Sequence, residues 1–236
     1  MIGSVLRLNT VSYTLTERLG AGACAQVFKA QASDGQQRLI KKYPKGRAAR
    51  PYTRGRRNHY GTMRDVSKVV FDELRKLAER CPFVPKLIER QRIDGSWFLV
   101  MEFVRGQNFA ELLQESLTVP GRAEAASELL GRVVRQWHNA GIAHGDPHLY
   151  NALVELEGVA PSSVRLIDMN MVHHPSFKYC QRCGCSFDRT QERNRYDEDL
   201  RNNDRRVGAG FLNELEREAP IRAQTMIEAF LLGYGQ

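Results

Sequence analysis

Two short polar segments in the second half of the chain constrain its fold most. The segment 144–151 reads His-Gly-Asp-Pro-His-Leu-Tyr-Asn, and the segment 166–170 reads Leu-Ile-Asp-Met-Asn. The residues between them predict a β-hairpin, in which two apolar runs flank a turn. The strands are expected at 152–156 and 164–167, with the turn at 157–163. Asp168 therefore directly follows an apolar strand.

Together the two segments resemble the catalytic loop and the metal-binding segment of the protein-kinase superfamily. The resemblance implies that Asp146 orients an attacking hydroxyl and accepts its proton. It also implies that Asn151 and Asp168 hold Mg²⁺ under the triphosphate of ATP. The fold implied is α+β and bilobal, with a five-stranded antiparallel sheet and one helix in the first lobe. The second lobe is expected to be short and mainly helical.

The segment 19–27 resembles the kinase glycine-rich loop, with Ala25 in place of the third glycine. Glycine lets the backbone approach phosphate oxygens closely, and alanine is the mildest replacement. The resemblance implies that Gly20, Gly22 and Val27 contact the nucleotide.

The next expected strand, 37–43, carries two adjacent lysines. A kinase needs one lysine at this strand to bind the α- and β-phosphates. The order Leu-Ile-Lys favours Lys41, because it parallels the apolar-apolar-Lys pattern of the superfamily. Strand alternation places Lys42 on the opposite face, where a solvated lysine is expected.

A helix predicted at 66–79 offers the carboxylate that fixes such a lysine. Its apolar residues recur with helical spacing. Glu73 is favoured over Asp72, since it has the longer reach and the residue type of the superfamily. The alternative is that Glu73 is an ordinary solvated helix carboxylate.

The remaining elements follow kinase order. Further strands are expected at 11–19, 26–31, 84–90 and 97–103, and helices at 108–116, 123–140 and 223–232. The resemblance implies that backbone groups of Glu102 and Val104 face adenine. The predicted lobes are residues 1–104, with the glycine-rich loop, and residues 105–236, with the catalytic loop.

Only 68 residues follow Asp168, and Met169-Asn170 replaces the Phe-Gly of the kinase motif. The chain therefore resembles abbreviated kinases. The pattern Asp-Pro-His-x-x-Asn at 146–151 is similar to bacterial lipopolysaccharide core heptose kinases and to UbiB-type kinases. His-Gly-Asp and the run at 40–46 are similar to Bud32-type kinases. The favoured acceptor is a lipopolysaccharide core sugar. The alternatives are an atypical Ser/Thr protein kinase of Bud32 or RIO type and a nucleotide-binding pseudokinase.

Positive charge is concentrated beside the expected nucleotide strand. The chain has a net charge of +8, and residues 35–64 hold ten Lys or Arg and no Asp or Glu. Such a segment attracts anionic partners, which include a lipopolysaccharide core at a membrane face and RNA. Charge alone does not choose between them, and a merely solubilising loop is the third reading.

A cysteine cluster at 180–185 has the Cys-x-x-Cys-Gly form of a metal knuckle. Cys180, Cys183 and Cys185 could bind Zn²⁺ if His173 or His174 supplied the fourth ligand. Free thiols in a loop are the competing reading, because no second Cys-x-x-Cys is present.

The chain has no apolar run long enough to span a bilayer and no signal-peptide pattern. Its cysteines are sparse and unevenly placed, unlike a secreted disulfide framework. The expected location is the cytoplasm, or the inner face of the cytoplasmic membrane as a peripheral protein.

Overall fold

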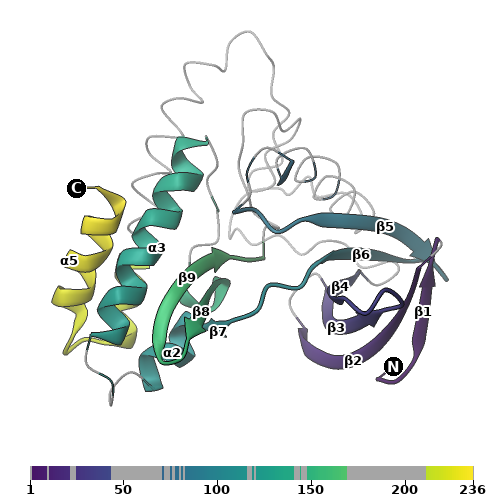
Figure 1. The fold of residues 1–236 in the computed structure, drawn as a ribbon, viewed down its shortest axis with the longest axis horizontal. Helices are drawn as coiled ribbons and strands as arrows, with labels where there is room; N and C mark the ends of the chain where they lie inside the picture. Colours follow the sequence, from purple (N-terminus) through teal and green to yellow (C-terminus); the bar gives the residue numbers. More distant parts are fainter. Residues whose placement is uncertain are drawn as a thin grey trace, which may run out of the picture. The chain divides into compact units, whose positions relative to one another are not determined.

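The computed structural model describes residues 2–9, 11–21, 25–43, 71, 75, 78–79, 81, 83–115, 119, 121–140, 144, 148–168 and 211–235. These residues form two compact units, which divide between Val104 and Arg105. Unit 1 is built on an antiparallel sheet, and unit 2 combines a smaller sheet with helices (Figure 1). None of the helices in the described ranges is long and apolar enough to cross a membrane.

Unit 1 contains a six-stranded antiparallel sheet in the order β1-β2-β3-β4-β6-β5. The strands are β1 (Val5–Leu8), β2 (Val11–Ala21), β3 (Gln26–Ala32), β4 (Gln37–Tyr43), β5 (Leu87–Ile93) and β6 (Ser96–Glu102). The prediction of five strands was wrong, because a sixth strand, β1, pairs with β2 through a tight turn at Asn9. Strand β5 also begins three residues later than expected. Pro85 has no N–H to donate to a strand pair, and the Val84 N–H closes a turn onto the Cys81 carbonyl.

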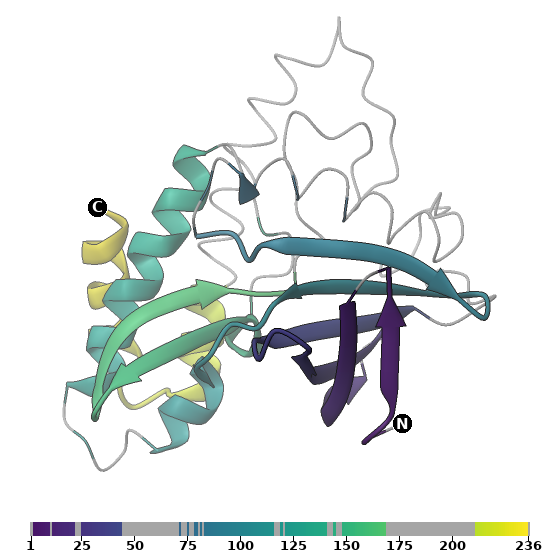
Figure 2. The same cartoon turned by 45° about the vertical axis from the view of Figure 1, so that its right-hand side comes forward.

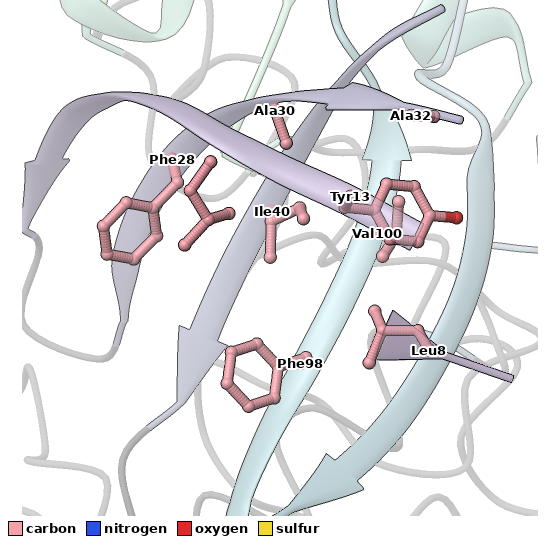
Figure 3. Packing of buried hydrophobic residues seen from close by; sticks show 9 residues of the cluster. Leu8, Tyr13, Phe28, Ala30, Ala32, Ile40, Phe98 and Val100 are labelled. Carbon is pink, nitrogen blue, oxygen red and sulfur yellow. The ribbon is translucent and has the colours of Figure 1, made fainter. Parts of the chain in front are cut away.

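The core of unit 1 lies on one face of this sheet. Its strands alternate, so every second residue enters the core. The cluster consists of Leu8, Tyr13, Leu15, Phe28, Ala30, Ala32, Ile40, Phe98 and Val100, and most of these are labelled in Figure 3. Burial of these side chains supplies the main stabilisation of unit 1.

The two edges of the sheet are joined by side chains that enclose this core. Asn9, at the β1–β2 turn, donates its backbone N–H to Gln91 Oε1 and its Nδ2–H to Glu89 Oε2, each at 2.7 Å. The Tyr13 hydroxyl donates to the Glu89 carboxylate. Because β1 and β5 are the opposite ends of the strand order, these bonds require the sheet to curl around its core. Figure 2 shows β1 and β2 turned relative to β5 and β6.

Unit 2 contains a three-stranded antiparallel sheet, ordered β7-β8-β9, and several helices. The elements are β7 (Gln107–Asn108), α2 (Phe109–Glu115), α3 (Arg122–Asn139), the 3₁₀ turn η2 (Leu149–Asn151), β8 (Ala152–Glu157), β9 (Ala160–Leu166) and α5 (Ala223–Tyr234). The expected hairpin is present, but its turn is shorter, with Gly158 in the left-handed region at φ 63°. A register shift between Glu155 and Leu156 lets β8 pair with Pro161.

Helices α3 and α5 approach each other closely at two glycines. A Cβ on Gly131 of α3 would overlap the carbonyl oxygen of Phe230, and a Cβ on Gly233 of α5 would overlap that of Glu128. An ion pair between Arg222 and Glu124 joins the two helices elsewhere along the contact. The backbones can therefore pack at this distance only because both positions lack a side chain.

We predict that Gly131→Ala and Gly233→Ala each destabilise the protein by about 1–3 kcal/mol, because the added methyl overpacks the contact. In a free helix the same change would stabilise by about 0.5–1 kcal/mol, so the sign of the effect is diagnostic. Urea unfolding of each variant measures it. Gln224→Ala, on the exposed side of α5, is the control and should change stability by less than about 0.5 kcal/mol. A more stable Gly131→Ala protein would contradict the close approach.

Burial, and secondly the bond to Glu89, raises the pKa of the Tyr13 phenol above its ordinary value of 10.0. In the unfolded chain the phenol ionises near pH 10, while in the folded protein it stays neutral. Stability that Tyr13 contributes is therefore complete below pH 10 and is lost as the pH rises further.

We predict that wild-type unfolding free energy falls steeply above pH 10 and that Tyr13→Phe makes this fall shallower. At neutral pH the variant should be less stable by about 1.5–3 kcal/mol, because it loses a hydrogen bond to a charged group. The Glu89→Gln variant should still lose part of its unfolding free energy above pH 10, since burial is the larger cause of the raised Tyr13 pKa. Denaturant titrations across alkaline pH test this, and identical slopes for wild type and Tyr13→Phe would refute it.

Candidate functional site

Lys41 lies on the face of the unit 1 sheet that is opposite the core cluster. It pairs with Val27 of β3 and Leu99 of β6, whereas its neighbour Ile40 belongs to the cluster. The Lys41 side chain is only 6% exposed. A buried ammonium group needs compensating anionic or carbonyl oxygens, which is the environment a phosphate-binding lysine requires.

Lys42 lies on the face of the sheet that carries the core cluster. It pairs with Phe98, a member of the core cluster, and its ammonium group lies 5.7 Å from the centre of the Phe98 ring. The two adjacent lysines thus point to opposite faces of one sheet, as strand alternation requires.

Of the other residues expected to contact nucleotide, Gly20, Val27 and Glu102 lie in strands of the same sheet. Gly20 of β2 pairs with Val27, and a Cβ on Gly20 would meet nothing within 4 Å. Glu102 ends β6, where its backbone N–H donates to Lys86 O at 2.8 Å and its Oε2 accepts from the Lys86 N–H at 3.0 Å. Val104 is buried. Gly22 lies outside the described residues.

In unit 2, His144 is bound to Ile167, the residue that lies between the end of β9 and Asp168. The ring is buried, and its Nε2 lies 2.7 Å from the Ile167 carbonyl oxygen. Because a carbonyl only accepts, Nε2 carries the proton. The His144 ring also packs against Trp137 of α3, with ring centres 5.5 Å apart.

Asn151 is bound to the same residue, Ile167. The Ile167 N–H donates to the Asn151 carbonyl at 2.8 Å, and Asn151 is only 5% exposed. Both hydrogen-bonding groups of the Ile167 backbone are therefore bound to the 144–151 segment. Asp168 follows immediately, with a left-handed backbone at φ 58°. Asp and Asn adopt this region more readily than most residues, at a modest cost.

These two residues fit a magnesium ion. The Asn151 amide and the Asp168 carboxylate offer oxygen atoms, which are the ligands that Mg²⁺ prefers. If Mg²⁺ is bound, Asn151 and Asp168 would hold it, and it would supply positive charge to neutralise the phosphate oxygens of ATP.

Several expected site residues lie outside the described residues. They are Asp146, Glu73 and its alternative Asp72, together with the zinc candidates His173, His174, Cys180, Cys183 and Cys185. Within the described ranges, no group of three or more His, Cys, Asp or Glu residues forms a metal site. All five zinc candidates lie outside these ranges, so the zinc site stays a prediction.

One contact at the site was missed by sequence reasoning. The amide nitrogen of Asn151 lies 3.0 Å from His148 Nε2. The signal was present in the sequence, because a histidine three residues before an asparagine can share one helical turn with it.

Comparison with known proteins agrees with this geometry. The family model of the RIO domain matches residues 13–176, which is more than half of the chain. No individual curated protein matches the chain significantly. The matched range includes Lys41, the 144–151 segment and Asp168, and it confirms the resemblance to small kinases of the RIO and Bud32 type. The chain belongs to the RIO domain family, a member of the protein-kinase-like superfamily.

Proposed function

We propose that this chain is an atypical kinase that binds Mg²⁺-ATP and transfers the γ-phosphoryl group to a hydroxyl. The family supports a phosphotransferase of this general kind. The observation that carries the proposal is that both backbone hydrogen-bonding groups of Ile167 are bound, one to His144 and one to Asn151, which holds the backbone of Asn151 next to the residue that precedes Asp168. A kinase needs these two residue types together to hold the metal.

In this proposal each residue has a defined role. Lys41 binds the α- and β-phosphates and is fixed by Glu73. Asp146 accepts the proton of the attacking hydroxyl. Catalysis then rests on positioning and on neutralising charge, because phosphoryl transfer asks little covalent chemistry of the protein. Gly20, Gly22 and Val27 cover the nucleotide, and backbone groups of Glu102 and Val104 face adenine.

The acceptor we propose is a Ser or Thr hydroxyl of a protein. The lipopolysaccharide acceptor, expected from the Asp-Pro-His-x-x-Asn pattern, has no support, because the matching family is that of RIO domains. The same finding leaves the membrane-face location without support. The basic segment within residues 35–64 lies mostly outside the described residues, and its anionic partner stays a prediction.

We predict that Lys41→Met lowers ATP turnover by roughly 100-fold or more, the usual effect of removing one charge-stabilising group. Lys42→Met is the matched control, since it removes the same charge from the opposite face of the sheet. It should retain near wild-type turnover. Phosphate release and labelling of a generic protein substrate measure both. An equal loss in the two variants would contradict the assignment of Lys41.

We predict that Asp168→Asn abolishes Mg²⁺-dependent ATP binding, whereas Asp146→Asn keeps binding and loses turnover. Asn is chosen at 168 because it tolerates the left-handed backbone there. Calorimetric titration with ATP, with and without Mg²⁺, separates the two effects.

Three outcomes of the binding, turnover and labelling measurements are informative. A folded wild-type protein that does not bind Mg²⁺-ATP would refute the proposed function. Binding without turnover on any acceptor would instead identify a pseudokinase. Labelling of core lipopolysaccharide, but not of protein, would overturn the proposed acceptor alone.

A further inference from the structure

We propose that His148 is a positioning residue that orients the side-chain amide of Asn151 so that its Oδ1 faces the magnesium ion. The inference rests on the proposed function, because it assigns a role to a residue beside a proposed metal ligand. Neither the kinase pattern nor the family match assigns a role to His148.

The hydrogen bond between these side chains has one direction only. Asn151 Nδ2 lies 3.0 Å from His148 Nε2. An amide nitrogen donates and does not accept, so His148 Nε2 must be the acceptor. The proton of the neutral imidazole then resides on Nδ1. The contact therefore specifies both the tautomer of His148 and the orientation of the Asn151 amide.

The backbone and a neighbouring ring hold this pair in place. The Asn151 N–H donates to the His148 carbonyl at 2.8 Å, which closes the 3₁₀ turn η2. Leu149 is fully buried within the turn. The Tyr150 ring contacts the His148 imidazole edge-to-face, with ring centres 6.2 Å apart. His148 is therefore a preorganised acceptor.

Orientation matters because the two ends of an amide act oppositely toward a cation. Oδ1 is a suitable ligand for Mg²⁺, whereas the NH₂ group would repel it. Binding of the NH₂ group by His148 leaves Oδ1 as the end that can serve the metal. Such outer-shell hydrogen bonds typically change metal affinity by about 10–100-fold.

The two histidines of the 144–151 segment thus have different tasks and opposite tautomers. His144 donates from Nε2 to the Ile167 carbonyl, which joins the segment to the residue before Asp168. His148 accepts at Nε2 from Asn151, which orients the ligand itself.

The first test measures the Mg²⁺ concentration needed for half-maximal binding of a non-hydrolysable ATP analogue. His148→Leu should raise it by about 10–100-fold, while metal-free binding of the analogue stays unchanged. His148→Gln should restore it to within a few fold, because Gln Oε1 can accept the same bond. His138→Leu is the control. It loses a hydrogen bond between α3 and Tyr234 of α5 and should leave the Mg²⁺ requirement unchanged.

The second test reads the tautomer directly and does not depend on bound metal. In protein labelled with ¹⁵N-histidine, at mildly alkaline pH where imidazole is neutral, His148 should show an unprotonated Nε2. His144 should show a protonated Nε2. A protonated Nε2 on His148 would mean a reversed Asn151 amide and would overturn the inference.

The outcomes separate this inference from the proposed function. Wild-type protein without Mg²⁺-dependent binding would overturn both. Wild-type binding together with an unchanged Mg²⁺ requirement in folded His148→Leu would overturn the inference alone. If His148→Leu does not fold, the Mg²⁺ requirement of His148→Gln and the tautomer of His148 decide the matter in its place.

Discussion

The backbone of Ile167 is the point on which the candidate site depends. Its carbonyl accepts from His144 and its N–H donates to Asn151, so the residue before Asp168 joins both ends of the 144–151 segment. His144 and Asn151 are buried, and an unmade bond there would leave a costly unsatisfied group. The two hydrogen bonds therefore fix Ile167 and the 144–151 segment relative to each other, and they also fix the backbone that leads into Asp168.

In unit 1, a single sheet carries both a hydrophobic core and a buried lysine. Its hydrophobic core occupies one face, where the curled edges enclose it through Asn9, Tyr13 and Glu89. The opposite face is then available for Lys41, in the same strand as the core residue Ile40. Because adjacent strand residues face opposite sides, a well-anchored core residue also orients the lysine beside it.

Helix α5 extends unit 2 beyond the residues matched by the family model, which end at 176. It packs on α3 at Gly131 and Gly233 and through the pair Arg222–Glu124. Helix α3 also supplies Trp137, which contacts the His144 ring. Helix α5 is thus connected to the candidate site through helix α3, although it lies outside the matched domain.

The sequence by itself determined the family-level fold and the pairing of its two motifs. Local periodicity placed β4 and α3 within a residue or two, and alternation separated Lys41 from Lys42, because both patterns depend only on neighbouring residues. Tertiary structure decided the rest. The added strand β1, the closure by Glu89, the glycine contact of α3 with α5 and the bond from Asn151 to His148 depend on atoms whose distances no local pattern sets. The expected lipopolysaccharide acceptor found no support for a related reason, since a six-residue resemblance at 146–151 carried less information than the domain-length match.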